Sequence, residues 1–595
     1  MVTPVPVSEL VTRAERWAAD RPDTLACQVG GRAPRSASYG EMARSVEETA
    51  AALALGGVRP GMRTVLLVRP GVELGVLVLS LLRLGAVPVM VDPGLPYAAV
   101  RRCLERAAPE AFIGVPLAQA ARLALGWARR TSRVVITVGH RHSWPGPTLA
   151  TLRTAARDLT RDSRAAAPGP TPDPHTPDLR AADPGPTPDP HTPDLRVTDA
   201  GPTPDPRAAA RGSMPGLPAP GAGDLALIAY TSGSTGPPKG VPLRHRHLTA
   251  QLDLLAGLEL IRAGAPVLST FIPFALGAAA LGATAVLPDL DPRRPLRFDP
   301  AALAADIRRY RVSTLFAAPA LLDRLARHCV ARGLVLDSLE TVAVAGAPLP
   351  LPTLDRVRAC VPGAARVLSV YGATECLPVA AIEGAELVAA HAAHRGAGTC
   401  LGPPMPGVEV RVIGVTDGPI DRWDEDLKVP PGTVGEFVVS SPAVSDPYLD
   451  DPGATALARI PDGDRVWHRM GDLGHLDEHG RLWFAGRKSE RVRALGGDLY
   501  TDHVETLLAG VPGTRRVALV GAGPRPVLVV EPEPGFRRDL VRTGILAEAA
   551  RHPRTAGLRE VLFHRRFPVD ARHNSKIRRD VLAAWAARRS RGGRR

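Results

Sequence analysis

The chain has 595 residues, and at roughly 100–200 residues per domain this length predicts several structural units. Its apolar share of 45% allows a sizeable core, as in an ordinary globular protein. The net charge of +14 comes from arginines spread along the chain, without a long basic run interleaved with aromatic residues, so we expect no nucleic-acid partner.

The first 160 residues alternate strand-like runs with helical patterns, which predicts a parallel sheet and the α/β fold class. The most hydrophobic stretch, Thr64–Val91, is interrupted by charged residues and prolines, and it predicts strand, helix and strand rather than a membrane span. The N-terminus lacks the apolar core of a signal peptide, and the six cysteines are scattered without a CxxC pair. We therefore expect a cytoplasmic protein without a transmembrane segment.

The composition changes abruptly between Pro168 and Pro206. The sequence PGPTPDPHTPDLR begins at Pro168 and again at Pro184, and GPTPDP returns at Gly201, so the repeat has a period of 16 residues. Such a segment has no apolar face to bury, which predicts a disordered Pro-rich insert.

Alternation of strands and helices resumes at Leu225 and is expected to continue to about Trp483. A short linker around Gly486–Lys488 then precedes a smaller unit of strands and helices. We expect residues 1–485 to form a large N-terminal domain that contains the insert, and residues 486–595 to form a small C-terminal domain with a basic tail.

The sharpest motif is the segment YTSGSTGPPKG, which follows the predicted strand Leu225–Ala229. Glycine and hydroxyl residues let a backbone loop approach a phosphate closely, and a lysine can close such a cage. The segment differs from a Walker A loop because Gly240 follows Lys239 and two prolines precede that lysine. The expected phosphate-binding residues are Thr231, Ser232, Gly233, Ser234, Thr235, Gly236 and Lys239.

This segment resembles the phosphate-binding loop of the acyl-adenylate-forming superfamily, which includes acyl-CoA synthetases, luciferases and the adenylation domains of peptide synthetases. The resemblance covers nearly the whole chain apart from the insert. It implies a large N-terminal adenylating domain of parallel and mixed sheets packed with helices, and a small, mobile α+β C-terminal domain. It also implies that the loop binds the β- and γ-phosphates of ATP, and that Thr231 contributes to a Mg²⁺ site.

Two further blocks appear in the order of the family. Gly346-Ala347-Pro348, after the predicted strand Thr341–Val344, is similar to the segment that flanks the adenine. Tyr371-Gly372-Ala373-Thr374-Glu375 is similar to the block in which tyrosine stacks on adenine, threonine reaches the α-phosphate or the acyl oxygen, and glutamate helps to hold Mg²⁺. Magnesium suits a carboxylate together with phosphate oxygens, so this block implies both nucleotide binding and catalysis.

Three later positions complete the resemblance. Asp472 lies in a block whose aspartate holds both ribose hydroxyls, which the two oxygens of a carboxylate can do at once. Arg487 lies in a block similar to the hinge and is expected to contact the nucleotide, although Ser489 stands where the family usually has aspartate or lysine. Lys576 lies in a block similar to the terminal one that delivers the catalytic lysine, whose charge stabilises the transition state as pyrophosphate leaves.

The sequence around these blocks, including WHRMGD at 467–472 and FPVDARHNSK at 567–576, most resembles the olefin-pathway β-lactone synthetases, which are often labelled fatty-acid–CoA ligases. The resemblance implies a long-chain 2-alkyl-3-hydroxy acid as substrate. After adenylation, the 3-hydroxyl of the acid attacks its own acyl carbonyl, expels AMP and closes a β-lactone without CoA. Because the hydroxyl and the carbonyl belong to one molecule, much of the entropic cost of bringing them together is already met. Implied partners are a thiolase-like condensing enzyme, a reductase and a β-lactone decarboxylase.

Several alternatives stay open. A long-chain fatty acyl-CoA synthetase and a fatty acyl-AMP ligase share the same first half-reaction. A non-catalytic acyl-binding scaffold on the same fold is a further alternative, against which the retained charged residues of the motifs argue. His245 or His247 could act near the substrate hydroxyl, but we favour the interpretation that both are solvent-facing residues of a helix.

Overall fold

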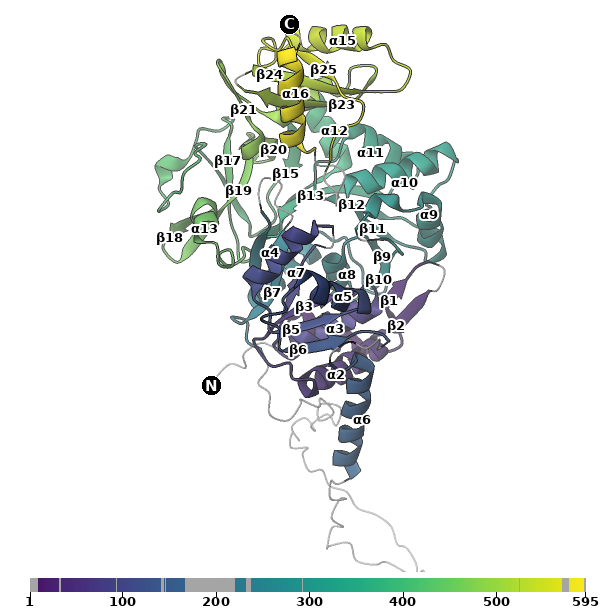
Figure 1. Ribbon diagram of the computed structural model, residues 1–595. Helices are drawn as coiled ribbons and strands as arrows, with labels where there is room; N and C mark the ends of the chain where they lie inside the picture. The colour runs from purple at the N-terminus through teal and green to yellow at the C-terminus, as the bar shows by residue number, and fades with distance from the viewer. Residues whose placement is uncertain are drawn as a thin grey trace, which may run out of the picture.

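The computed structural model describes residues 9–31, 34–92, 94–140, 144, 146–165, 220–231, 237–291, 293–523, 525–569 and 577–592. The Pro-rich insert, Ser232, Gly233, Ser234, Thr235 and Gly236 of the phosphate loop, and Lys576 lie outside the described residues. Figure 1 shows two α/β layers in the lower and middle part of the molecule, an antiparallel sheet beside them, and a small sheet with α15 and α16 at the C-terminal end.

The first α/β sheet is formed by the chain on both sides of the insert. Its strands run in the order β6-β5-β3-β4-β7-β8, and all neighbours are parallel except the edge pair β7 and β8. The predicted strand, helix and strand over Thr64–Val91 are confirmed as β3, α3 and β4. The strands are β3 (Arg63–Leu67), β4 (Val87–Met90), β5 (Ala111–Gly114), β6 (Val134–Thr137), β7 (Leu225–Thr231) and β8 (Lys239–Arg244); the helices are α2 (Tyr39–Leu55), α3 (Val72–Arg83), α4 (Tyr97–Ala107), α5 (Pro116–Leu125) and α6 (Leu149–Ala165).

The second α/β sheet has eight strands in the order β14-β13-β12-β11-β9-β10-β1-β2. It is parallel from β13 to β1, and an antiparallel strand closes each edge. The strands are β1 (Leu25–Val29), β2 (Arg35–Ser38), β9 (Pro266–Ser269), β10 (Thr284–Leu287), β11 (Thr314–Ala317), β12 (Thr341–Ala345), β13 (Arg366–Ala373) and β14 (Cys376–Glu383). The helices are α1 (Glu9–Asp20), α7 (His245–Gly257), α8 (Ile272–Ala280), α9 (Pro300–Arg309), α10 (Pro319–Ala331), α11 (Leu351–Arg358) and α12 (Gly384–Ala393).

The third sheet corrects the expectation that α/β alternation continues to Trp483. It is antiparallel, with the order β15-β20-β19-β17-β16 and β18 paired to β19. Strand β16 buries Val410 and Val412 but only partly covers Arg411 between them, which is the two-residue period of a sheet with one covered face. The elements are β15 (Thr399–Gly402), β16 (Glu409–Ile413), β17 (Gly435–Ser440), α13 (Pro452–Ala458), β18 (Arg459–Asp462), β19 (Arg465–Leu476) and β20 (Leu482–Arg487).

The predicted linker at Gly486–Lys488 is also corrected. Gly486 and Arg487 are the last residues of β20, because they continue its pairing with β19, and the chain leaves the sheet only at the short 3-10 helix η4 (Lys488–Glu490). Beyond it lie the hairpin strands β21 (Val492–Ala494) and β22 (Gly497–Leu499), then α14 (Thr501–Leu508), β23 (Thr514–Ala522), β24 (Arg525–Pro532), α15 (Arg538–Ala550), β25 (Val561–Phe563) and α16 (Arg579–Gly592). Among the described residues, no helix is long and apolar enough to cross a bilayer.

Candidate active site

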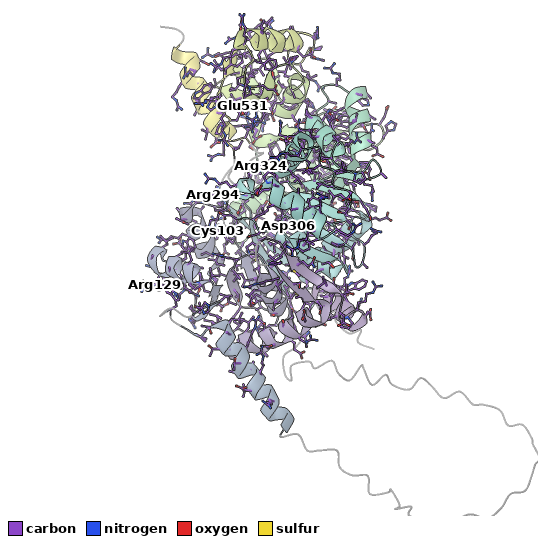
Figure 2. All side chains as sticks on the ribbon, turned by 90° about the vertical axis from the view of Figure 1, so that its right-hand side faces the viewer. Cys103, Arg129, Arg294, Asp306, Arg324 and Glu531 are labelled. Atoms are coloured by element: carbon purple, nitrogen blue, oxygen red, sulfur yellow. The ribbon has the colours of Figure 1, made fainter. Side chains whose placement is uncertain are left out.

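The predicted motifs meet in one cleft with a volume of about 3020 Å³. The carboxyl ends of parallel strands from both α/β sheets open into it, which is where open α/β sheets bind their ligands. In Figure 2, Arg324, which lines the cleft, lies between Cys103 of α4 below and Glu531 of the C-terminal unit above. The predicted site residues that line the cleft are Lys239, Gly346, Ala347, Pro348, Tyr371, Gly372, Thr374, Glu375, Asp472 and Arg487.

Tyr371, Asp472 and Arg487 form one connected group. The Tyr371 hydroxyl donates a hydrogen bond of 2.7 Å to Asp472 Oδ2, and Arg487 Nε lies 3.1 Å from Asp472 Oδ1. Asp472 and Arg487 face each other in the β19–β20 register, which fixes the ion pair. Burial and the neighbouring Asp472 carboxylate raise the pKa of Tyr371 well above its ordinary value, so that Tyr371 remains a neutral donor.

Glu375 is the centre of a second group of cleft residues. Its Oε1 accepts a 2.7 Å hydrogen bond from the Tyr448 hydroxyl, and its backbone carbonyl accepts one of 2.8 Å from the Ser445 amide. Lys239 Nζ lies 4.6 Å from the centre of the Tyr448 ring. Thr231 is the last residue of β7 and pairs with Lys239 of β8, so the strand ends that carry the phosphate loop also reach this group.

Two glycines of the motifs occupy positions that exclude a side chain. A Cβ on Gly372 would lie 2.9 Å from Leu377 Cβ and 3.1 Å from the Cys376 carbonyl oxygen. Gly346 has a φ of +93°, which L-residues with a side chain rarely adopt. Gly346 directly follows β12 and Gly372 is the next-to-last residue of β13, so the backbone at these strand ends can come close to a ligand in the cleft.

Tyr448 and His468 line the cleft but were not predicted from the sequence. The Tyr448 and His468 rings meet edge to face at 6.5 Å, and burial lowers the pKa of His468 to about 4. His468 lies four residues before Asp472 on β19, and both line the cleft. Tyr448 lies outside every predicted motif, and only the fold brings its hydroxyl to Glu375.

A buried charge cluster anchors the strand that carries Asp472. Glu436, fully buried, accepts hydrogen bonds from Arg469 (2.7 Å) and from Lys488 (2.8 Å). Arg469 also donates 2.7 Å hydrogen bonds to the carbonyls of Thr416 and Gly418. The cluster therefore ties β19, β17 and the first residue of η4 together.

The residues after Ser489 are held by the C-terminal unit instead. Arg579 donates to Glu490 at 2.8 Å and to the two Glu505 oxygens at 2.6 and 2.9 Å. Asp417, which is largely exposed, pairs with Arg491 at 2.9 Å and also with Arg493. Lys488 and Glu490, the two neighbours of Ser489, thus belong to different networks.

The interpretation of His245 and His247 as solvent-facing residues is wrong. Each has an exposed fraction of 3%, because the first turn of α7 lies beneath the segment that carries Asp446. His247 Nδ1 accepts a 3.0 Å hydrogen bond from the Arg244 amide, which caps the helix. Burial lowers the pKa of His247 to about 4, and neither histidine lines the cleft.

Comparison with known proteins agrees with this geometry. Residues 14–449 match the family described as AMP-binding enzyme. The chain belongs to the AMP-binding enzyme family. The olefin beta-lactone synthetase of Stenotrophomonas maltophilia (strain K279a) is 41% identical over 97% of this chain and 98% of that protein. The olefin beta-lactone synthetase of Xanthomonas campestris pv. campestris is 41% identical over 96% of each chain.

Solved structures place the AMP-binding fold over the whole chain. The amide bond synthetase McbA of Marinactinospora thermotolerans has a TM-score of 0.70 at 23% identity and covers 97% of this chain and 99% of its own. ATP-bound MatB of Rhodopseudomonas palustris has a TM-score of 0.70 at 21% identity, over 98% and 99%. The predicted family resemblance, fold class and enzyme class are confirmed.

Proposed function

We propose that this AMP-binding enzyme converts a long-chain 2-alkyl-3-hydroxy acid and ATP into a β-lactone, AMP and pyrophosphate, in olefin or β-lactone biosynthesis. The observation that carries the proposal is that the nucleotide motifs share one cleft with a long apolar wall. That inner wall consists of Leu252, Leu255, Phe274, Leu276 and Phe316. Similarity to two proteins named olefin beta-lactone synthetase, at 41% identity, supports the choice of substrate and product.

The proposed roles follow the two groups in the cleft. The adenosine lies at the Tyr371 and Asp472 end, with Gly346-Ala347-Pro348 beside the adenine and Arg487 beside the ribose. The phosphates lie at the Lys239 and Glu375 end, below the loop that starts at Thr231. Thr374 and Lys576 complete the catalytic set, and Lys576 comes from the C-terminal unit that follows β20, which we propose is mobile.

The residues at the phosphate end fit a magnesium ion. The described residues contain no group of three His, Cys, Asp or Glu side chains that could enclose a metal ion. Magnesium is commonly held by one or two carboxylates together with substrate phosphates, so a dedicated cage is not required. Glu375, oriented by the Tyr448 hydroxyl, would supply the carboxylate, with Thr231 nearby, and the ion would neutralise phosphate charge.

The second half-reaction decides between the proposal and its alternatives. With the acid, ATP and Mg²⁺ but no thiol, the product is expected to be lighter than the acid by one water, because the tethered hydroxyl displaces AMP. Mass spectrometry of the product, with and without CoA, measures this directly. A plain fatty acid without the 3-hydroxyl is the control and should stop at acyl-AMP. Accumulation of a thioester that requires CoA would instead identify an acyl-CoA synthetase.

The Tyr371 hydroxyl offers a test of the nucleotide end. Tyr371→Phe keeps the ring but removes the hydrogen bond that orients Asp472, and such a bond to a charged group contributes about 1.5–3 kcal/mol. We expect the KM for ATP to rise roughly tenfold while kcat changes little, since ribose contacts serve the ground state and the transition state alike. Tyr310→Phe, far from Asp472, is the matched control. A fall in kcat at constant KM would contradict the proposed role.

The partners of the chain are also a proposal. A β-lactone with two alkyl arms is poorly soluble, so the enzymes that form the 3-hydroxy acid and that consume the lactone are expected to work nearby. We propose a thiolase-like condensing enzyme and a reductase upstream, and a β-lactone decarboxylase downstream.

A further inference from the structure

Helix α5 has an inverted distribution of polar and apolar side chains. Its buried face carries Gln119, which donates to the Ile136 carbonyl at 3.1 Å, and Arg122, which donates to the Ser132 carbonyl at 3.3 Å. Its outer side carries Leu117, Leu123 and Leu125, with exposed fractions of 64%, 38% and 38%. No other described helix or strand has more than one large hydrophobic residue exposed to this degree. Apolar surface gathered in this way usually marks a binding site.

Part of this outer side forms a groove that joins the cleft. Leu117, Ala121, Ala124 and Leu125 follow the spacing of one helix face, and all four line the cleft. Tyr97 of α4, with an exposed fraction of 59%, lies opposite, and its ring packs 5.9 Å from that of Trp127. The five residues Tyr97, Leu117, Ala121, Ala124 and Leu125 are called the α5 groove below.

The direction of the α5 groove connects the reaction site with the surface. Helix α5 starts directly after β5, whose carboxyl end faces the cleft, and its ten residues span about 15 Å. Beyond its end lies Arg129, which Figure 2 shows at the edge of the molecule. None of the five residues of the groove is charged, and the small alanine side chains between the leucines suit a chain of methylene groups.

We propose that the α5 groove binds one of the two hydrocarbon arms of the acid, while the inner wall of the cleft binds the other. This inference rests on the proposed function, because only a 2-alkyl-3-hydroxy acid carries two long arms. The arms leave adjacent tetrahedral carbons, so a staggered rotamer can direct them to different parts of the cleft. The described cleft lining includes apolar residues on α7, α8 and β11 and apolar residues on α4 and α5.

The test measures how KM depends on the length of each arm of the acid, in the wild type and in a variant of the α5 groove. The variant Leu117→Ser/Leu125→Ser removes two apolar contacts, and the matched control Leu159→Ser changes a leucine that is 57% exposed on α6, outside the cleft. Three acids are used: one with two long arms, and two isomers in which either the arm at C2 or the arm at C3 is shortened to methyl. KM for each acid, KM for ATP and lactone yield by mass spectrometry are measured, with thermal unfolding as a check of folding.

The expected pattern is specific to one arm. The double variant should raise KM about tenfold for the two-armed acid, because burial of methylene groups in the groove is lost. It should raise KM equally for the isomer that keeps the long arm bound in the groove, and leave KM unchanged for the isomer in which that arm is shortened. KM for ATP and the control should not change. An equal effect of the double variant on the KM of all three acids, or no effect on any of them, overturns the inference. In that case, lactone formation by the wild-type enzyme still upholds the proposed function. Unchanged kinetics with lost binding to phosphatidylglycerol vesicles would assign the groove to a membrane surface instead. Absence of lactone from every acid with the wild type overturns both.

Discussion

Lys576→Ala is expected to slow acyl-AMP formation by about 10²- to 10³-fold, the cost of one lost donor in the transition state. As the acid carboxylate attacks the α-phosphorus, negative charge grows on the phosphoryl and departing pyrophosphate oxygens, and an ammonium group stabilises that charge. Arginine is used nearly everywhere else in this chain, so the choice of lysine indicates a compact point charge at a crowded oxygen. Release of pyrophosphate, measured with the acid and ATP, gives the rate.

The structure on both sides of Lys576 indicates that the substitution should not disturb folding. Val569 and Ile577 form a β-bridge, and the Arg578 amide donates to the Pro568 carbonyl at 2.8 Å, so residues on both sides of Lys576 are held independently of it. Thermal unfolding should therefore stay close to that of the wild type. Lys428→Ala is the matched control, because Lys428 is a surface lysine paired with Glu425. Wild-type pyrophosphate release in the Lys576 variant would remove this residue from the mechanism.

Glu436→Gln is expected to cause the largest loss of stability, about 3–5 kcal/mol, because it leaves buried Arg469 and Lys488 without their counter-charge. The two cations would keep only uncharged acceptors there, which are the carbonyls of Thr416 and Gly418 and the new amide oxygen. Trp467 and Trp483 belong to the same sheet, so urea unfolding followed by tryptophan fluorescence reports on this region.

An exposed glutamate on the same sheet serves as the control. Glu409 pairs with Arg465 at 2.6 Å with roughly half of both side chains exposed, and such surface pairs contribute about 0–1 kcal/mol. Glu409→Gln should therefore unfold at nearly the same urea concentration as the wild type. Equal small effects of both variants would show that the Glu436 cluster does not stabilise the fold.

Local patterns predicted the elements that precede the motifs. The strands before the phosphate loop and before Gly346 were predicted because short apolar runs are followed by segments that contain glycine. The antiparallel sheet was missed because each of its strands alone resembles any short strand, and because the pairing of β15 with β20 joins residues as far apart as Cys400 and Trp483. Likewise, the burial of His245 and His247 depends on a segment some 200 residues later, which no local pattern reveals.

The residues of the candidate site also fall into those that the sequence predicted and those that it did not. Residues whose role needs a particular backbone or charge, such as Gly372, Asp472 and Lys239, lie in recognisable motifs. Tyr448 was missed because it acts through Glu375, and a hydrogen bond between residues 73 positions apart leaves no trace in the sequence of either. The extension of the cleft along α5 was missed because exposed leucines are ordinary when single and become significant only when the fold gathers them.

The division of attachments around Ser489 has a mechanical consequence. Lys488 is anchored to a buried carboxylate on one side and Glu490 to a largely buried arginine on the other, and Arg491 reaches across Ser489 to the Lys488 carbonyl and to Asp417. A peptide unit is planar and rigid, so each residue offers only two soft torsions. We expect a turn of the C-terminal unit against the third sheet to use φ and ψ of Ser489, because its two neighbours are held on opposite sides. The ion pair of Arg395 with Glu548 is a further contact that such a turn would have to break.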